Sequence, residues 1–410
     1  MKCNNCSEKL KITEKISHLN EEEVFILKHP KKVFNVNYQI RLDNGKVKTF
    51  SGYRIQYNDA LGPTKGGIRF HQDVDLEEVS ELAFLMSLKN SLAGIPYGGA
   101  KGGISFNPKE YSKGEIERIS RGYVKAIHKN IGEHIDIPAP DVNTTPEIMA
   151  WMTDEYEKIV GHKAPGVFTG KPVEIGGSLG RGTSTARGGF FIIEEIYKNI
   201  EKEKLKVAIQ GFGNAGQHIA TFLSNIGFKI IAVSDSSSGL YNENGLDIEN
   251  LIKYKENKGK FSMYDNGAKL ISNNELLELE CEILVPAALG HVITKENAQN
   301  IKAKTILELA NAPIEPTADK ILDEKKITII PDILANSGGV IVSYFEWVQN
   351  LQNYYWTEDE VNSKLKYQIL KAYENVLTDK NKYELSSLRE AAYSVAIKRI
   401  LTAEKLKGNL

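Results

Sequence analysis

Two kinds of hydrophobic pattern divide the chain. In the first 185 residues, apolar positions at three- and four-residue spacing predict a helix over 76–92, and residues 53–57 predict a strand. Glycines then crowd the stretches 98–103 and 176–182. Because glycine lets a backbone approach a ligand closely, these loops are candidates for a binding site.

From residue 205 onwards the chain repeats short apolar runs, and helical segments separate several of them. The runs lie at residues 207–209, 230–233, 283–285, 306–307 and 327–330. Strands that alternate with helices in this way are typical of a parallel, doubly wound sheet. The sequence therefore predicts an α/β protein whose second domain has a Rossmann-type fold.

Helices are predicted on both sides of this second region. Residues 188–199 predict a helix that leads into it, and the C-terminal part of the chain is helical in pattern. Thr357 with Glu360, and Ser387 with Glu390, have the spacing of capping boxes and are predicted to open the last two helices. A chain of 410 residues is long enough for two domains. The predicted bounds are 1–185 for the first domain, 186–345 for the Rossmann domain and 346–410 for C-terminal helices that return toward the first domain.

Composition and charge exclude several classes of function. The 52 basic and 53 acidic residues give a formal net charge of −1, so no overall field favours nucleic acid or an anionic membrane. No stretch approaches the roughly 18 consecutive apolar residues of a membrane-spanning helix. The N-terminal residues are polar, and the chain has three cysteines. We therefore expect a cytoplasmic protein without a secretory signal or a disulfide framework.

Two of the cysteines, Cys3 and Cys6, form a C-x-x-C pair. Such a pair can be half of a zinc site or a redox couple. The sequence contains no second C-x-x-C and no Cys/His cluster that would complete four ligands, so we expect two incidental thiols in a terminal segment and no metal site. Cys281 is expected just before a buried strand or at its start.

A glycine-rich segment follows the first strand of the second region. Its six residues, Gly211, Phe212, Gly213, Asn214, Ala215 and Gly216, form a G-x-G-x-x-G. A predicted helix over 217–226 follows, and the next strand ends at Asp235, about 20 residues further on. This context predicts a dinucleotide site in which the pyrophosphate lies on the helix N-terminus. The alternative is a tight turn in an unrelated α/β domain.

The residues after the second strand bear on the choice of dinucleotide. Asp235 would accept hydrogen bonds from a ribose and repel a 2′-phosphate, and the following residues 236–238 are serines without a basic neighbour. NAD is therefore favoured over NADP. NADP stays open as an alternative, because serines can hydrogen-bond a phosphate.

Three lysines and one aspartate of the first domain are candidates for chemistry. Lys65 and Lys101 lie between glycines, Lys89 lies in the predicted helix 76–92, and Asp141 lies in a proline-stiffened loop. A lysine that is desolvated among glycines acquires a lowered pKa and can act as a base. Taken singly, each lysine is better explained as a surface loop lysine, and Asp141 fits the cap of a helix that begins near Pro146.

These segments together resemble the glutamate dehydrogenases within the glutamate/leucine/phenylalanine/valine dehydrogenase family. The resemblance runs from about Val33 to the C-terminal helices. Beyond the segments above, it rests on Thr-Gly-Lys-Pro at 169–172, Gly-Gly-Ser-Leu-Gly-Arg at 176–181, and Pro-Asp-Ile-Leu-Ala-Asn-Ser-Gly-Gly-Val at 331–340 followed by Ser-Tyr-Phe-Glu-Trp at 343–347.

The resemblance implies roles for individual residues. Lys101 would activate the water that attacks an iminium, Asp141 would move protons to and from the amino nitrogen, and Lys89 would bind the substrate α-carboxylate. The remaining substrate residues would be Lys65, Gly66, Ala139, Thr185, Val340 and Ser343, with Lys65 and Ser343 receiving the side-chain carboxylate. The cofactor would be held by the glycine-rich turn together with Asp235, Ser236, Thr185, Asn311 and Asn336.

Lys65 distinguishes between substrates within the family. A buried ammonium needs a carboxylate partner, and an apolar side chain would leave it unpaired at a cost of several kcal/mol. We therefore predict the reversible oxidative deamination of L-glutamate to 2-oxoglutarate and ammonia, with two domains closing over the substrate and with a homohexameric assembly. The alternatives are a dehydrogenase for an apolar amino acid and a catalytically idle regulatory homologue.

The sequence departs from the commoner family form in two places. Residues 308–313 read Glu-Leu-Ala-Asn-Ala-Pro where Glu-Gly-Ala-Asn-Gly-Pro is usual, and residues 288–292 are unusual for a loop that approaches the cofactor. These differences bear on cofactor preference more than on the chemistry. His291 is expected to be a loop histidine without a catalytic role.

Overall fold

The computed structural model describes residues 19–257, 259–264 and 267–410. Cys3 and Cys6 therefore lie outside the described residues. The chain forms two compact units: unit 1 comprises residues up to 181 together with 340–362 and 393–410, and unit 2 comprises residues 182–339 and 363–392. Within the described residues, no helix is long and apolar enough to cross a membrane.

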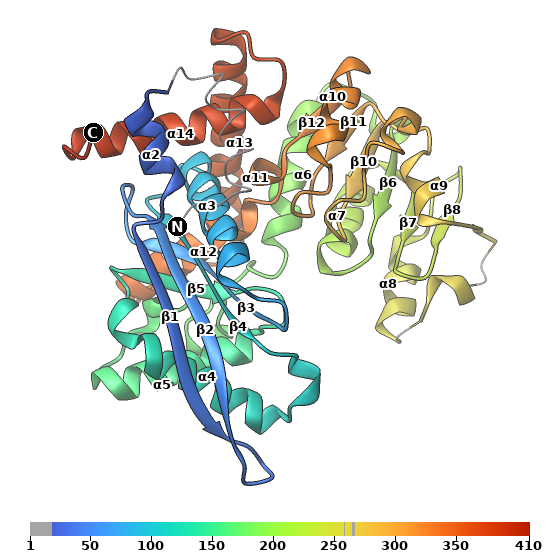
Figure 1. The fold of residues 1–410 in the computed structure, drawn as a ribbon. Helices are drawn as coiled ribbons and strands as arrows, with labels where there is room; N and C mark the ends of the chain where they lie inside the picture. The colour runs from blue at the N-terminus through green and yellow to red at the C-terminus, as the bar shows by residue number, and fades with distance from the viewer. Residues whose placement is uncertain (1–18, 258, 265–266) are drawn as a thin grey trace. The chain divides into compact units, whose positions relative to one another are not determined.

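Unit 1 is built on a five-stranded sheet with the order β1-β2-β4-β3-β5 (Figure 1). Its strands are β1 (Lys32–Arg41), β2 (Val47–Asn58), β3 (Thr64–His71), β4 (Gly98–Ser105) and β5 (Asp136–Pro140). β1 and β2 form a long antiparallel hairpin, whereas β3 runs parallel to both β4 and β5. The predicted strand 53–57 lies within β2.

Helices cover this sheet and begin at side chains suited to capping. They are α2 (Glu21–Lys28), α3 (Leu76–Leu92), α4 (Lys113–Ile127) and α5 (Pro146–Val160). α3 has the predicted bounds, and its N-cap Asp75 accepts a hydrogen bond from the backbone of Glu78. Thr145 caps α5 and Pro146 occupies its first turn. Asp141 is thus not needed as the cap of this helix.

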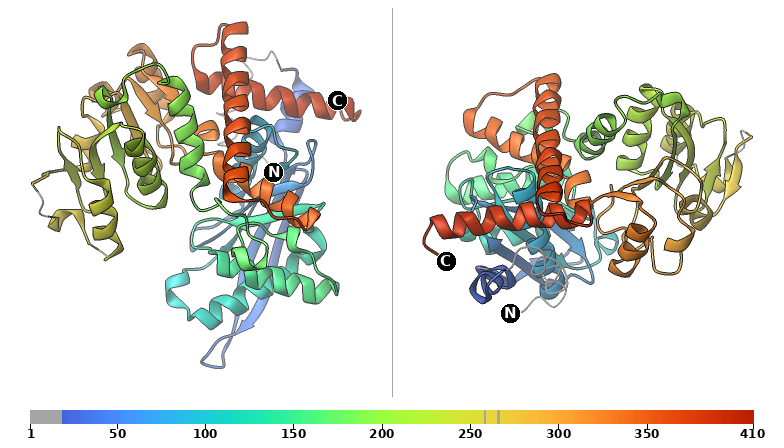
Figure 2. Two further views of the ribbon diagram at one scale, coloured as in Figure 1. Left: turned by 180° about the vertical axis from the view of Figure 1, so that it is seen from behind. Right: turned by 90° about the horizontal axis from the view of Figure 1, so that it is seen from above.

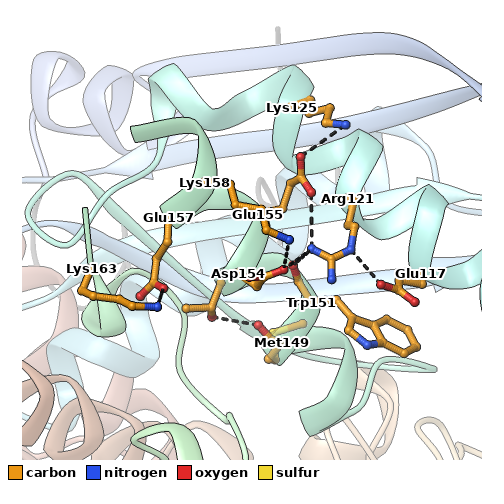
Figure 3. A network of polar contacts seen from close by, with 11 residues as sticks. Glu117, Arg121, Lys125, Met149, Trp151, Asp154, Glu155, Glu157, Lys158 and Lys163 are labelled. Atoms are coloured by element: carbon orange, nitrogen blue, oxygen red, sulfur yellow. Dashed lines mark hydrogen bonds and ion pairs between the residues drawn. The ribbon is translucent and has the colours of Figure 1, made fainter. Parts of the chain in front are cut away.

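α4 and α5 pack on one another and cover an apolar core that includes Phe50, Phe70 and Tyr123. Arg121 of α4 joins the two helices on their outer side (Figure 3). Its guanidinium pairs with Glu117, Asp154 and Glu155, at 2.9, 2.6 and 3.3 Å. The arginine is partly exposed, so these charges remain in contact with water.

Unit 2 contains a seven-stranded sheet with the order β12-β11-β10-β6-β7-β8-β9. Its strands are β6 (Lys206–Gln210), β7 (Lys229–Ser234), β8 (Gly239–Tyr241), β9 (Lys269–Ile271), β10 (Ile283–Pro286), β11 (Thr305–Leu307) and β12 (Thr328–Ile330). The pairs from β12 through to β7 are parallel, which confirms the predicted doubly wound sheet. β8 and β9 pair antiparallel at one edge and were not predicted.

The apolar core of unit 2 lies between this sheet and its helices. Cys281 is buried there, two residues before β10, as predicted. The helices that lie wholly within this unit are α6 (Ser184–Ile196), α7 (Asn214–Asn225), α8 (Ile248–Glu256), α9 (Asn273–Leu277), α10 (Pro316–Glu324) and α11 (Asp332–Ala335). Short 3-10 helices occur at Pro108–Glu110, His128–Asn130, Pro165–Val167, Val173–Ile175, Lys202–Lys204, Phe261–Met263 and Ala298–Asn300.

Three C-terminal helices are α12 (Gly338–Gln352), α13 (Glu358–Lys382) and α14 (Leu388–Leu406), and each contributes residues to both units. Thr357 and Glu360 form the predicted reciprocal capping box at the start of α13. At α14, Ser387 caps the backbone of Glu390, but the Glu390 carboxylate accepts from Ser386 instead. Figure 2 shows α13 beside α6, where Lys366 and Glu194 pair at 2.8 Å.

Two residues without glycine's freedom adopt left-handed backbone conformations in facing loops of unit 2. Ala312 has φ 44° and His291 has φ 54°, and the His291 N–H donates to the Ala312 carbonyl at 2.9 Å. His291 is exposed in its loop, as predicted. A Cβ in the left-handed region costs roughly 1–2 kcal/mol, so a glycine would suit position 312 better than alanine. The departure noted in the sequence is therefore a strained position.

Replacing Ala312 with glycine should relieve this strain. We expect the free energy of unfolding of unit 2 to rise by about 0.5–1 kcal/mol, since part of the gain is offset by the greater entropy of glycine in the unfolded chain. Denaturant unfolding followed by hydrogen exchange measures the change. Ala318→Gly, inside α10, is the matched control and should lose about 1 kcal/mol or more. A loss of stability in Ala312→Gly would contradict the assignment of strain.

Candidate functional site

Three neighbouring strands of unit 1 hold the predicted catalytic side chains. β3 carries Lys65 and lies between β4, which carries Lys101, and β5, which ends one residue before Asp141. Side chains two positions apart along a strand point to the same face of the sheet, so Lys65 and Arg69 share a face of β3. The sheet thereby gathers charged groups from segments far apart in the sequence.

Asp141 lies between two cations. Its Oδ1 accepts a hydrogen bond from Lys101 Nζ at 2.7 Å, and its Oδ2 accepts from Arg69 Nε at 2.8 Å. Arg69 also pairs with Glu78 in the first turn of α3. The Asp141 backbone N–H donates to Thr144 Oγ1 at 2.6 Å. Both carboxylate oxygens and the backbone of Asp141 are therefore fixed in position.

The charges around Asp141 determine its protonation state. Burial alone would raise the pKa of Asp141, but the positive charges of Lys101 and Arg69 outweigh it and hold that pKa well below its usual range. Burial lowers the pKa of Lys101, and the neighbouring carboxylate reverses this only in part. Asp141 is thus an anion at neutral pH, and Lys101 is closer to being a usable base than an exposed lysine.

Two glycines of β3 make this approach possible. A Cβ at Gly66 would lie 1.6 Å from the carbonyl oxygen of Ala100 on β4. A Cβ at Gly67 would lie 2.8 Å from the Cβ of Asp141. Any side chain at position 67 would therefore move the Asp141 carboxylate away from its two cations. Gly66, predicted as a substrate residue, serves here to bring β3 and β4 together.

Lys65 is a buried cation, with only 1% of its surface exposed. Burial, and then the positive charges of Arg54 and Arg181, lower its pKa well below the ordinary value. The carboxylates of Glu346 and Asp136 act on it in the opposite direction but do not outweigh these effects. Among the described residues, Lys65 forms neither an ion pair nor a side-chain hydrogen bond.

Both nearby carboxylates are already paired with other cations. Asp136 accepts from Arg54 Nε at 2.7 Å and from its Nη2 at 2.5 Å, and both residues are completely buried. Glu346 accepts from Lys171 Nζ at 2.8 Å, again with both side chains fully buried. Neither carboxylate is therefore available to pair with Lys65 when it is protonated.

Ser343 lies on α12, three residues before Glu346. Its hydroxyl and that of Thr169 are 2.5 Å apart, and both residues are buried. The backbone N–H groups of Gly170 and Lys171 donate to the Glu346 carboxylate. The segment that contains Thr169 is thus fastened to α12, and Thr169 orients Ser343.

The other predicted substrate residues occupy separate elements. Lys89 is half-buried in the last turn of α3, and Ala139 is buried on β5. Val340 is half-buried in the first turn of α12. Thr185 is half-buried in the first turn of α6, in unit 2.

The glycine-rich turn of unit 2 connects β6 to α7, as predicted. Gly211 has φ 98°, and a Cβ there would lie 2.5 Å from the Cβ of Ala288. A Cβ at Gly216 would lie 1.9 Å from the carbonyl oxygen of Gly211, so this glycine brings the helix against the turn. A Cβ at Gly213 would meet nothing within 4 Å. The turn is thus open at Gly213, at the N-terminus of α7, where a pyrophosphate fits.

Buried polar atoms next to this turn support a ligand site. The Gln210 side-chain oxygen, at the end of β6, and the Ser238 hydroxyl have no hydrogen-bond partner among the described residues. Buried polar groups are normally paired, so these two atoms are available to a ligand. The open turn and these two atoms together fit a dinucleotide.

Asp235 follows β7, and its carboxylate is turned into its own loop. Oδ1 accepts from the backbone and the hydroxyl of Ser237, and Oδ2 accepts from Lys255 Nζ at 2.8 Å and from the backbone of Phe261 at 3.0 Å. Burial opposes ionisation of Asp235, but these donors hold its pKa well below the usual range. Ser236 is exposed beside it. Asp235 is thus an anion that also organises the surrounding loop.

The predicted asparagines of the cofactor site are in contact. Asn336 Nδ2 donates to Asn311 Oδ1 at 3.0 Å, and it also lies near the carbonyl oxygens of Leu309 and Ala310. Asn336 follows α11, whereas Asn311 lies in the loop after β11.

Sequence reasoning missed several charged neighbours. Arg69 lies four residues after Lys65 on β3 and so shares its face, but no strand was predicted over these residues. Arg181 was quoted as part of a motif but received no role. Lys255 lies about 20 residues from Asp235, and no local pattern indicates that the two would pair.

Arg69 should control the pH dependence of the reaction. In Arg69→Gln, the loss of a nearby positive charge raises the pKa of both Lys101 and Asp141. Because a proton-accepting amine must be neutral, the ascending limb of the reaction rate against pH should move to higher pH, and the maximum rate should fall.

Initial rates across a pH series measure this shift. Arg121→Gln removes an arginine that also faces three carboxylates but lies outside this site, and it should leave the limb in place. A limb that does not move in Arg69→Gln would contradict the electrostatic coupling.

Comparisons with known proteins identify the family of this chain. The family model described as Glutamate/Leucine/Phenylalanine/Valine dehydrogenase matches residues 176–408, and its dimerisation-domain model matches residues 30–158. An NAD-specific glutamate dehydrogenase of Staphylococcus aureus (strain COL) is 49% identical over 390 residues, which cover 93% of this chain and 92% of that protein.

Solved structures are also similar to this chain. Glutamate dehydrogenase from Peptoniphilus asaccharolyticus has a TM-score of 0.89 and 42% identity, with both chains covered completely. The hetero-hexameric glutamate dehydrogenase from Thermus thermophilus, in a Leu-bound form, has a TM-score of 0.92 and 33% identity, covering 98% of this chain and 95% of that one. The chain belongs to the Glutamate/Leucine/Phenylalanine/Valine dehydrogenase family.

Proposed function

We propose that this protein is a glutamate dehydrogenase that converts L-glutamate and water to 2-oxoglutarate and ammonia, reversibly, with NAD as the hydride acceptor. The observation that carries the proposal is the buried ammonium of Lys65, whose neighbouring carboxylates are paired with other cations. The 49% identical relative is an NAD-specific glutamate dehydrogenase, which supports the same substrate and cofactor.

Lys65 favours glutamate over apolar amino acids. A carboxylate at the end of the substrate side chain would neutralise the ammonium, with Ser343 as a second donor oriented by Thr169. A leucine or valine side chain would leave the buried cation without a counter-ion, at a cost of several kcal/mol. This argument disfavours the apolar amino-acid dehydrogenase that the family resemblance left open.

The pair formed by Lys101 and Asp141 supports catalysis and disfavours an idle homologue. Bound NAD supplies the hydride acceptor for the hydrogen on the substrate α-carbon. Lys101, with its lowered pKa, takes a proton from the water that adds to the resulting iminium carbon. Asp141 would move protons to and from the amino nitrogen as ammonia leaves, at the stage when Lys101 is neutral and no longer lowers the pKa of Asp141. Lys89 would hold the substrate α-carboxylate during these steps.

The cofactor would be held by residues of unit 2. The turn at 211–216 offers the N-terminus of α7 to a pyrophosphate, and Thr185, Asn311 and Asn336 would approach the nicotinamide end. Asp235 with Ser236 would lie at the ribose. The anionic Asp235 disfavours a 2′-phosphate, so NAD is preferred, with NADP as the weaker alternative.

The assembly is proposed to be a homohexamer. The similar protein from Thermus thermophilus is hetero-hexameric, and a dimerisation-domain model of the family matches residues 30–158 of this chain. Sedimentation or light scattering of the purified protein would give its mass directly.

Exchange of Lys65 should change the substrate preference. In Lys65→Leu, kcat/KM for glutamate should fall by about 10²–10³-fold, because a buried charge pair is lost, while leucine and valine should become relatively better substrates. NADH absorbance with each amino acid measures the profile. Lys65→Arg keeps the charge and should not move the preference toward apolar substrates. An unchanged profile in Lys65→Leu would remove the main support for glutamate.

Removal of the proposed base should slow turnover without loss of cofactor. Lys101→Ala is expected to lower kcat by roughly 10²–10⁴-fold, while NADH binding stays near the wild-type value. Lys163→Ala removes an exposed lysine that pairs with Glu157 and should leave both quantities unchanged. Near-normal turnover in Lys101→Ala would exclude its role as the base.

A further inference from the structure

Arg389, in the first turn of α14, lies in a cluster of three carboxylates within unit 2. Its Nη1 and Nη2 donate to the two oxygens of Glu308 at 2.8 and 2.7 Å, a bidentate pair. Asp319 of α10 accepts from Nη2 at 3.1 Å, and Asp332 lies 3.8 Å from Nη1. Glu308 is completely buried. One guanidinium therefore balances three acidic groups.

Two of these acids accept backbone hydrogen bonds that connect the cluster to the loop containing Asn311. Glu308 is the residue directly after β11, and its Oε2 accepts from the Asp332 backbone N–H at 2.8 Å. Asp332 Oδ2 in turn accepts from the Ala312 backbone N–H at 2.9 Å. Ala312 is the strained residue next to Asn311. The path from Arg389 to this loop thus consists of direct hydrogen bonds.

The third acid, Asp319, lies on a different element from the loop that contains Asn311. It lies on α10, and its two carboxylate oxygens contact Arg389 Nη2 and Nε at 3.1 and 2.9 Å. The cluster therefore contains an internal comparison. Glu308 and Asp332 connect the guanidinium to the loop, whereas Asp319 holds the guanidinium from the side of α10.

The protonation of the cluster depends on the arginine. Burial raises the pKa of Glu308 to about 7, although Arg389 opposes this, and burial also raises the pKa of Asp319. Without the guanidinium, Glu308 would be a buried acid beside two others, and its bidentate contact would be lost. Nothing would then hold the Glu308 carboxylate in the position where it accepts the hydrogen bond from the Asp332 backbone N–H.

We propose that Arg389 is a positioning residue for the cofactor, because it fixes the loop 309–312 and hence Asn311 through Glu308 and Asp332. This inference rests on the proposed function, in which Asn311 and Asn336 lie at the nicotinamide end of NAD. Arg389 does not touch the reacting atoms. It acts by holding the loop in its strained conformation.

Arg121 provides a matched control, since it also faces three carboxylates, on the outer side of α4 and α5 in unit 1 (Figure 3). Its partners lead to no predicted cofactor residue. A structural role alone would make the two arginines equivalent. Loss of either would lower thermal stability, and neither loss would alter cofactor affinity.

The experiment compares NADH affinity and thermal stability in Arg389→Gln, Arg389→Lys, Asp319→Asn and Arg121→Gln. NADH binding is followed by fluorescence in the absence of substrate, so it does not depend on turnover. We expect Arg389→Gln to weaken NADH binding by at least about tenfold and Arg389→Lys to weaken it less. Asp319→Asn and Arg121→Gln should bind NADH within about twofold of wild type, whatever their melting temperatures.

Steady-state kinetics gives a second readout. The KM for NAD should rise in the Arg389 variants, while the KM for glutamate should stay within about twofold. Folded Arg389 variants that bind NADH as wild type does would overturn the inference, and so would an equal loss of affinity in Arg121→Gln. Should Arg389→Gln fail to fold, Arg389→Lys alone decides between these outcomes. Failure of the wild-type protein to bind NADH would instead contradict the proposed function.

Discussion

The arrangement of the buried charged side chains in unit 1 depends on the cost of burying a charge without a counter-ion. Arg54, Lys171 and Lys101 each meet a carboxylate at hydrogen-bonding distance, and these pairs leave the ammonium of Lys65 unmatched. Further hydrogen bonds hold the elements near Lys65 in place. Arg54 also donates to the carbonyl oxygen of Gly66, and the segment 169–171 is hydrogen-bonded to α12. A ligand carboxylate would complete the set of ion pairs, so substrate recognition and the stability of this site depend on the same electrostatic requirement.

The two halves of the proposed reaction are built by different means. In unit 1, parallel strands place charged side chains side by side, and glycines remove the bulk that would separate them. In unit 2, the proposed cofactor site relies largely on the backbone, through a turn at a helix N-terminus and a loop held in an unfavourable conformation. The proposed chemistry therefore depends mainly on charged side chains, and the proposed cofactor binding depends mainly on backbone conformation.

Much of this arrangement could be predicted from the sequence, because it is written in local patterns. The bounds of α3, the parallel strands of unit 2 and the glycine-rich turn follow from periodicity and spacing. The resemblance to a known family supplied the pairing of Lys101 with Asp141. Contacts between distant segments were not predictable: Arg69 with Glu78 depends on how α3 lies on the sheet, and Lys255 reaches Asp235 from a separate helix. The antiparallel strands β8 and β9 read Gly-Leu-Tyr and Lys-Leu-Ile, without the apolar run of isoleucine, leucine and valine that marks the parallel strands.

The division of the chain between the units has a consequence for its synthesis. The buried carboxylate of Glu404, near the end of α14, accepts a hydrogen bond from Asn58 and pairs with Lys31, and the Ala396 carbonyl accepts from Ser91. Contacts of such large sequence separation form late. On the ribosome, the strands of unit 1 are synthesised before residues 393–410 and must wait for them before their unit is complete, while residues 182–339 of unit 2 form a continuous segment that can fold earlier. The N-terminal sheet is thus the part of the nascent protein that remains longest exposed to chaperones and to misassembly.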